Sequence, residues 1–289
     1  MTDLEPILAR VHALLDRVEP WLPPAALTPD WTAAAWRWRR QGASGWLEAI
    51  HRPHRLRLDD LCCIDQQRAE IDRNTRQFLA GRGANNVLLW GSRGTGKSSL
   101  IKALLSEYAD RGLRLIEVDK EDLIHLPDIL HLIDGRPERF ILYCDDLSFE
   151  AGESGYKALK AALDGSLQAT PDNLLIYATS NRRHLLPEFQ HENREAKLID
   201  GEIHQGEGVE EKISLSDRFG LWLSFYPFGQ DQYLEVVQHW LGRLGVTITD
   251  PETVNRAALQ WALRRGSRSG RTAWQFARDW AGRNDAGAG

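Results

Sequence analysis

The stretch that decides the fold is NVLLWGSRGTGKSSL, residues 86–100. Apolar residues lead to a glycine, a glycine-rich turn follows, and Lys97 opens a run with helical spacing. The turn, residues 91–98, matches G-x-x-x-x-G-K-[ST] in full, between a predicted strand and a predicted helix. In this setting the glycines let backbone N–H groups point inward around phosphates, and the amino end of the helix adds its dipole.

The motif assigns phosphate binding to a short run of residues. Lys97 is expected to reach the β- and γ-phosphates of a nucleotide, and the hydroxyl of Ser98 to bind Mg²⁺. The alternative is a chance match in a glycine-rich turn, which the strand–turn–helix setting disfavours. The residues expected to bind phosphate are Gly91, Ser92, Arg93, Gly94, Thr95, Gly96, Lys97, Ser98 and Ser99.

A second motif, ILYCDD at residues 141–146, places two acids at the end of an apolar strand. A phosphate loop needs a second magnesium anchor on a neighbouring strand, and Asp145 is expected to hold the water shell of the metal. Asp146 is then placed to orient or deprotonate an attacking water. Two acids that merely end a strand are the alternative interpretation.

Three further polar residues follow predicted strands or precede helices. LLIYATSN ends at Asn181, which would lie between the acid pair and the γ-phosphate if the strands are neighbours. SLSDRFG places Arg218 before the next strand, and SRSGRTAW places Arg271 at the start of the last helix. Taken singly, each of these residues is an ordinary loop or surface group.

The apolar pattern predicts an α/β fold. Five near-continuous apolar runs alternate with helical segments, which is typical of a parallel sheet with helices on both faces. These predicted strands are residues 86–90, 113–118, 139–144, 174–180 and 221–226. After Pro227 only helical patterns occur, so a small all-helical C-terminal domain is expected.

These patterns divide the chain into three parts. Residues 1–55 are expected to be a helical, tryptophan-rich segment, residues 56–227 the α/β domain, and residues 228–289 the helical lid. The tryptophans of the first part either pack it onto the next domain or form a surface for a partner. Residues 188–212 carry a net charge of −5, and we expect a long exposed insertion there.

The composition indicates a globular protein of the reducing cytosol, so we expect a cytoplasmic location. The chain has 289 residues and a formal net charge of −5, which disfavours bulk nucleic-acid binding but allows a local basic patch. Its three cysteines, Cys62, Cys63 and Cys144, have neither disulfide nor metal spacing. No run approaches the ~20 apolar residues of a membrane span, and the amino-terminal residues lack the apolar core of a signal peptide.

The order of these motifs resembles the AAA+ ATPases from about Leu56 to Ala281. The resemblance implies that residues 91–98 are Walker A, Asp145 and Asp146 Walker B, and Asn181 sensor 1. It further implies that Arg218 is an arginine finger given to a neighbouring subunit, and that Arg271 is a sensor 2 residue that contacts the nucleotide. ATP and Mg²⁺ as cofactors, and a homo-oligomer, follow from the same resemblance.

A narrower resemblance is to a bacterial family of predicted AAA+ ATP-binding proteins. The segments that resemble this family are NNVLLWGSRGTGKSSL, DDLSFE, YATSNRRHLLPE and DGEIHQGEGVEEKISLSDRFGLWLSFYPF. Because the last segment includes part of the acidic insertion, the resemblance implies that the insertion is a family trait. The family implies ATP binding but names no substrate. Residues near Cys62 to Asp65 are implied to contact the adenine. A protein or nucleic-acid partner is expected through the N-terminal segment or the 188–212 insertion.

One departure leaves two functions open. Most AAA+ proteins have Asp-Glu at Walker B, whereas this chain has Asp145-Asp146, and the shorter acid is expected to make hydrolysis slow. The protein is therefore either an ATPase that remodels or recruits a macromolecule, or a nucleotide-controlled adaptor or loader with little turnover. A small-molecule kinase lacks support, because no arginine-lined acceptor lid is recognisable.

Binding of GTP is also disfavoured. VDKED, residues 118–122, resembles a guanine-reading motif. It follows the second predicted strand, too early in the chain, and has Asp in place of Asn.

Overall fold

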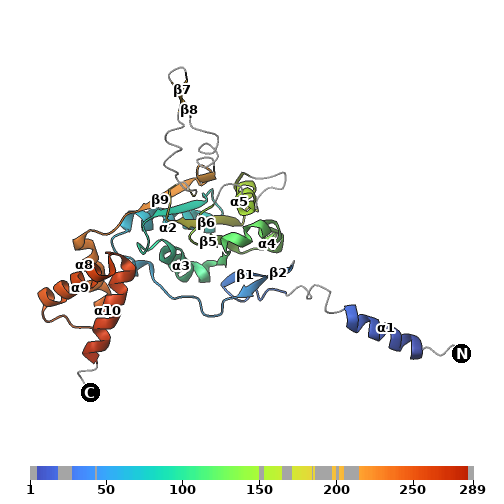
Figure 1. Ribbon diagram of the computed structural model, residues 1–289, viewed down its shortest axis with the longest axis horizontal. Helices are drawn as coiled ribbons and strands as arrows, with labels where there is room; N and C mark the ends of the chain where they lie inside the picture. The colour runs from blue at the N-terminus through green and yellow to red at the C-terminus, as the bar shows by residue number, and fades with distance from the viewer. Residues whose placement is uncertain are drawn as a thin grey trace.

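The computed structural model (Figure 1) contains one large sheet with helices on both faces. The sheet has seven strands in the order β2-β1-β4-β5-β6-β3-β9, and all pairs are parallel except β1–β2. The structure describes residues 5–18, 28–42, 44–149, 153–164, 171–183, 185, 197–199, 202–204 and 215–285.

All five predicted strands are present and adjacent. They are β3 (Val87–Gly91), β4 (Leu113–Glu117), β5 (Arg139–Cys144), β6 (Leu174–Ser180) and β9 (Leu221–Phe225). The strand that leads into the phosphate loop, β3, lies between β6 and β9, so β6 separates it from the strand that ends in the acid pair. The carboxyl ends of β3, β5 and β6 therefore meet at one edge of the sheet.

The sheet has two more strands than the five expected. Residues 1–55 were expected to be helical, but among the described residues of this segment the one α-helix is α1 (Glu5–Val18). Instead, β1 (Ala35–Gln41) and β2 (Ser44–Ala49) form a hairpin that extends the sheet beside β4. The reason is a period of two in β1: Trp36 and Trp38 are each 1% exposed, while arginines alternate with them. These two rings pack into the core, as the first interpretation of the tryptophans expected.

Helices cover each face of the sheet through a separate apolar cluster. On one face, α2 (Asp65–Leu79) and α3 (Lys97–Tyr108) pack against Val87 and Leu89. On the other, α4 (Leu126–Ile133) and α5 (Ser154–Asp164) pack with Leu88. Both faces of the central strands are thus buried, which explains their near-continuous apolar sequences.

The C-terminal part is helical, as expected. It consists of α8 (Gln230–Arg243), α9 (Pro251–Arg265) and α10 (Gly270–Asp285), which lie together beside the carboxyl edge of the sheet (Figure 1). Tyr233 is fully buried among them and donates to the carbonyl oxygen of Ala258 (3.1 Å), which ties α8 to α9.

Short elements complete the description. Three 3₁₀ turns, η2, η3 and η4, span Leu58–Asp60, Ala109–Arg111 and Lys120–His125. Within the acidic insertion the structure describes only β7 (Lys197–Ile199) and β8 (Glu202–His204), an antiparallel pair, and the rest of that insertion lies outside the described residues. In the described part of the chain, every helix is too short or too polar to cross a membrane.

Candidate functional site

The phosphate loop between β3 and α3 follows a path that requires glycine. Gly91, Gly94 and Gly96 have φ values of 126°, 74° and 104°, in the left-handed region that side chains disfavour. A Cβ atom on Gly91 would lie 2.0 Å from the carbonyl oxygen of Phe225, because β9 passes directly beside the loop. The path of the loop is therefore fixed by its glycines and by its contact with β9.

Lys97 lies inside this loop and is only 6% exposed. Its Nζ donates to the carbonyl oxygens of Gly91 (2.7 Å) and Ser92 (2.8 Å), and to Asn181 Oδ1 (3.3 Å). Loss of hydration lowers the pKa of Lys97 to about 8, although Asp146 and Asp145 favour its charged form. All three acceptors are neutral, so an anionic phosphate oxygen would be a stronger partner for the ammonium group.

A hydroxyl and a carboxylate face each other at the start of α3. Ser98 Oγ donates to Asp145 Oδ1 (2.7 Å), and Thr179 Oγ1 donates to the same oxygen (2.6 Å). Partial desolvation opposes ionisation of Asp145, but the hydrogen bonds from Thr179 and Ser98 outweigh it and keep its pKa below the usual value.

These oxygen ligands fit magnesium. Mg²⁺ prefers oxygen ligands and is usually bound through one or two carboxylates together with substrate phosphates and water. Among the described residues, there is no group of three or more His, Cys, Asp or Glu side chains that could hold a metal alone. A metal at Ser98 and Asp145 would therefore depend on a bound nucleotide for its other ligands.

Asp146 and Asn181 are joined at the same edge of the sheet. Asn181 Nδ2 donates to Asp146 Oδ1, and the Asp146 N–H donates to Thr179 Oγ1 (2.9 Å). Arg93 Nη2 lies 3.5 Å from Asp146 Oδ2. Because Asn181 also contacts Lys97, the structure brings together four of the residues that were singled out in the sequence: Lys97, Asp145, Asp146 and Asn181.

Thr179 is a member of this group that sequence reasoning missed. It is 1% exposed, near the end of β6, and its hydroxyl links the backbone of Asp146 to the carboxylate of Asp145. The available signal was a hydroxyl residue at the end of an otherwise apolar strand, because a buried polar group needs hydrogen-bond partners.

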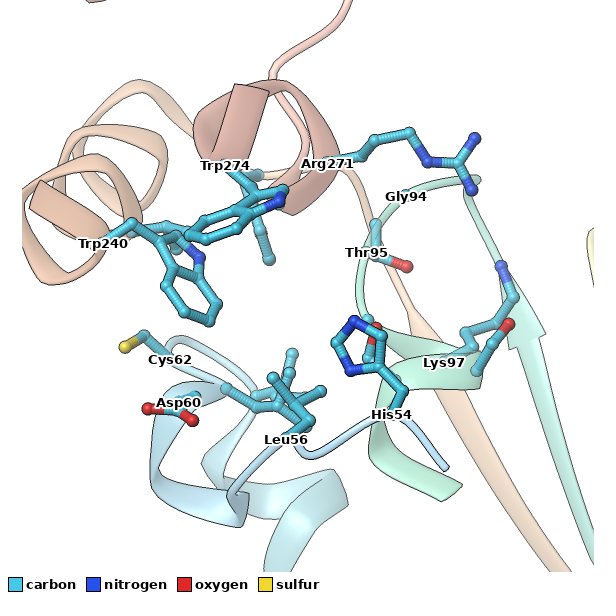
Figure 2. Close-up of a pocket in the computed structure, with 18 of the residues that line it drawn as sticks. His54, Leu56, Asp60, Cys62, Gly94, Thr95, Lys97, Trp240, Arg271 and Trp274 are labelled. Atoms are coloured by element: carbon cyan, nitrogen blue, oxygen red, sulfur yellow. The ribbon is translucent and has the colours of Figure 1, made fainter. Parts of the chain in front are cut away.

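A cavity of about 520 Å³ extends from the phosphate loop to the helical domain (Figure 2). Figure 2 shows Lys97 and Thr95 at one end, and Leu56 and Cys62 facing Trp240 and Trp274 at the other. The two indole rings meet edge to face, with centroids 4.6 Å apart. The second end therefore offers an apolar, aromatic wall large enough to contact a flat ring.

Several residues of this cavity were not expected from the sequence. They come from the segment before α2 and from the helical domain, and they are His54, Arg55, Leu56, Asp60, Leu61, Phe228, Val236, Trp240, Arg243 and Trp274. Cys62 and Ile64, in the region where the AAA+ resemblance implies contact with adenine, also line the cavity. Only the packing of α8 and α10 over residues 54–64 brings these groups together, and no local pattern marks it.

An ion pair connects the two sides of this end of the cavity. Asp60, 6% exposed, lies 3.0 Å from Arg243 Nε and 3.6 Å from His239 Nε2 on α8. The Asp60 carboxylate also accepts the backbone N–H of Arg57 (3.0 Å). The segment before α2 and the helical domain are thus held to one another directly.

Arg271 lies where the helical domain touches the phosphate loop. Its backbone N–H is 3.3 Å from the carbonyl oxygen of Gly94, and the residue lines the cavity. Figure 2 shows its side chain extending from α10 past Gly94. Movement of α10 would therefore move Arg271 relative to the loop.

Arg218 is not brought to the other residues within this chain. It precedes β9 and forms an ion pair with Asp164 at the end of α5. The phosphate loop adjoins the opposite end of β9, since Gly91 pairs with Phe225, and residues 221–225 alone span about 13 Å. Arg218 therefore lies on the amino edge of the sheet, away from its own phosphate loop.

Comparisons with known proteins identify the family and the fold. The family model described as "Protein of unknown function (DUF815)" matches residues 31–284, so the chain belongs to this family. A comparison with curated proteins gives no match.

Two single-residue variants of Thermotoga maritima RuvB have similar structures, at 13% and 14% identity. Each has a TM-score of 0.50 and aligns over 77% of this chain and 63% of its own. A structure titled as a DNA replication initiation factor also matches, with a TM-score of 0.47 at 15% identity, over 75% of this chain and 61% of its own. The chain spans about three-fifths of the RuvB chains that it matches. The likeness to the two variants shows that this chain shares their fold.

Proposed function

We propose that this DUF815 protein binds ATP with Mg²⁺ in the cavity and hydrolyses it slowly as an oligomer, to remodel or recruit a macromolecular partner. The observation that carries the proposal is the convergence of Lys97, Asp145, Asp146 and Asn181 at the mouth of a preformed phosphate loop. A lysine, two acids and an amide at the carboxyl edge of a parallel sheet form the constellation that phosphoryl transfer needs.

Each residue has a proposed role. The N–H groups of residues 91–99 and Lys97 hold the phosphates. Ser98 and Asp145 would hold the metal, which would supply positive charge to the phosphate oxygens. Asp146 accepts a proton from the attacking water, and Asn181 positions both that water and the Asp146 carboxylate. Arg271 contacts the nucleotide from the lid.

The adenine is proposed to lie against Leu56, Cys62, Trp240 and Trp274. An apolar, aromatic wall suits a purine ring, which offers a flat face for stacking. The guanine-like motif at residues 118–122 does not contribute to base binding. Its Lys120 donates to the carbonyl oxygen of Ser148, lies near the Glu153 carboxylate and does not line the cavity. ATP is therefore favoured over GTP.

The adaptor or loader with little turnover is the second candidate. The Asp146 carboxylate is engaged by Asn181 and lies near Arg93, and its side chain is one methylene shorter than glutamate. Both features would leave the carboxylate poorly placed to contact an attacking water.

Calorimetry with ATP and magnesium, together with steady-state turnover, tests the proposal and separates the two candidates. Wild type is expected to bind ATP, and Lys97→Ala is expected to lose binding because the γ-phosphate loses its cation. Lys157→Ala, an exposed lysine on α5, is the matched control and should bind normally. Unchanged affinity in Lys97→Ala would remove the phosphate loop from the proposal, while tight binding without turnover would select the adaptor.

A further inference from the structure

The positive charge of the helical domain is concentrated in one stretch. Residues 253–278 contain six arginines and neither aspartate nor glutamate. Because the whole chain has a formal net charge of −5, the other residues together carry −11. The stretch runs along α9, through the α9–α10 turn and into α10, and its arginines are Arg256, Arg264, Arg265, Arg268, Arg271 and Arg278.

Three of these side chains form what we call the arginine cluster: Arg264, Arg265 and Arg268. All three residues are exposed. In the described part of the chain, two arginines of α8–α10 form ion pairs with carboxylates. They are Arg243 and Arg283, and neither belongs to the cluster. The cluster therefore presents positive charge to the surroundings.

The helix end does not need these arginines as caps. Gly266, with φ of 65°, donates its N–H to the Leu263 carbonyl oxygen (3.1 Å), and Ser267 donates to that of Ala262 (3.2 Å). Two of the last carbonyl groups of α9 are thus satisfied by backbone donors, as in a glycine-ended helix. Arg265 also lies over the Trp261 ring, 5.2 Å from its centroid, but this contact does not neutralise its charge, and backbone donors cap the helix without the arginines.

The composition around the cluster suits a sugar-phosphate backbone. Protein contacts to phosphate come mainly from arginine and lysine, from hydroxyl side chains, and from backbone N–H groups and helix amino ends. Here the arginines surround exposed Ser267, and α10 begins two residues after Arg268. Leu263, 82% exposed, adds an apolar contact for sugar or base.

The spacing of the charges also matches a regular polyanion. Arg256 and Arg264 are two turns apart on one side of α9, about 12 Å along the axis, with exposed Gln260 between them. One nucleic-acid strand carries a charge about every 3.4 Å of duplex axis, so this distance covers roughly three phosphates. The guanidinium group binds phosphate through two parallel hydrogen bonds, which lysine cannot do.

We propose that the arginine cluster binds the sugar-phosphate backbone of a nucleic acid, without reading its sequence. The site is new relative to the N-terminal segment and the acidic insertion, where a partner was expected. It goes beyond the proposed ATPase activity and does not depend on it.

The cluster lies next to the phosphate loop. A Cβ atom on Gly94 would lie 2.9 Å from Ser269 Oγ, one residue beyond Arg268, and Arg271 contacts the same glycine. If ATP occupies the loop as proposed, nucleotide and nucleic acid would bind adjacent parts of one turn, and each would change the affinity of the other by the same factor.

The test is fluorescence anisotropy of a labelled 30-nucleotide single strand and a 30-base-pair duplex with the full chain, between 50 and 200 mM salt. The triple variant Arg264→Gln, Arg265→Gln, Arg268→Gln is expected to bind about tenfold more weakly at 50 mM salt. Its slope of log K against log salt should be smaller by about 2 to 3, because three phosphate contacts are lost. Arg271 is left intact.

The matched control is Arg73→Gln, Arg82→Gln, Arg111→Gln, which removes the same charge from exposed positions on and after α2 and after α3. This control should keep the wild-type slope of log K against log salt. By calorimetry, both triple variants should bind ATP as wild type does. That measurement tests whether the variants fold, and it separates this proposal from the ATPase proposal. Three results would overturn the proposal: no salt-sensitive binding by wild type, an equal loss in the control, or polyglutamate bound as tightly as the single strand.

Discussion

At the scale of single residues, the protonation of Lys97 decides how the phosphate loop responds to pH. Burial lowers its pKa to about 8 in the free chain, whereas bound phosphate would hold it charged. Above pH 8 the free chain has mostly lost this proton, so binding of ATP must take one up. Below pH 8 the proton is already present, and the affinity is expected to be insensitive to Lys97.

We therefore expect ATP affinity to fall about fivefold from pH 8 to pH 9, with proton uptake approaching one per ATP at pH 9. Calorimetry in buffers of different ionisation enthalpy measures both quantities. Lys97→Arg is the control, since arginine stays charged over this range and should abolish the uptake. Equal affinity and no uptake for wild type at pH 9 would show that Lys97 remains charged in the free loop.

Asp146 is the proposed general base, and two substitutions test it. Asn should leave ATP affinity unchanged and lower turnover by about 10²- to 10⁴-fold, because an amide cannot accept the proton of water. Asn also tolerates the left-handed backbone of this position, where φ is 51°, so a folding defect is not expected. Steady-state turnover beside calorimetric affinity measures both effects.

Asp146→Glu is the informative partner of this variant. If the short side chain limits turnover, glutamate should be as fast as wild type or faster. A large loss of turnover in Asp146→Glu, with ATP still bound, would mean that aspartate is the fitted acid and that hydrolysis is not slowed by its length.

At the scale of elements, α10 is the part of the lid that meets the phosphate loop. The position of the Arg271 side chain depends on that of α10, because the Arg271 backbone contacts Gly94 and its side chain extends past the loop. A side chain that reaches the γ-phosphate distinguishes ATP from ADP, because only ATP offers that charge.

Arg271→Ala is therefore expected to weaken ATP about tenfold more than ADP, the effect of one charge-assisted hydrogen bond. Calorimetric titration with both nucleotides gives the comparison, and Arg283→Ala, an exposed arginine near the end of α10, is the control. An equal loss of both affinities would assign Arg271 to the end of its helix and not to the γ-phosphate.

At the scale of the whole molecule, the proposed role of Arg218 depends on assembly of several subunits. Arg218 lies on the amino edge of the sheet with Asp164, away from the phosphate loop of its own chain, so a role in hydrolysis would require the loop of another subunit. An arginine supplied by a neighbour is worth about 10³ to 10⁵ in rate. We therefore expect Arg218→Ala to bind ATP normally and lose turnover by about this factor, and wild-type specific activity to rise with protein concentration.

Mixing two inactive variants provides the decisive test. Lys97→Ala subunits lack a working loop but keep Arg218, and Arg218→Ala subunits have the reverse defect. A mixture that assembles should regain part of the wild-type turnover. A mixture that assembles without activity, or a monomer with full activity, would leave Arg218 as a structural partner of Asp164.

Local sequence was sufficient for the strands and for the phosphate loop. The central strands β5 and β6 are buried on both faces, and β3, β4 and β9 are partly buried, so all five appear in the sequence as largely apolar runs. The loop could be predicted because its chemistry is contiguous: three positive-φ glycines, a lysine and a serine lie within eight residues. Asp145, Asp146 and Asn181 could be named because strand ends are visible in sequence and parallel strands end at a common edge.

The tertiary structure decided what depends on contacts between distant segments. The hairpin β1–β2 was missed because the alternation of tryptophan and arginine in β1 is short, and only the pairing of β1 with β4 gives it a place in the sheet. Trp240 and Trp274 form one wall only because α8 packs on α10, and Asp60 is held by Arg243 from the far side of the same cavity. Sequence alone determines which chemical groups the chain has and how neighbouring residues fold. The packing of helices against the sheet decides which of these groups share a site. The reason is that burial of apolar area is favourable whatever the separation of the residues along the chain.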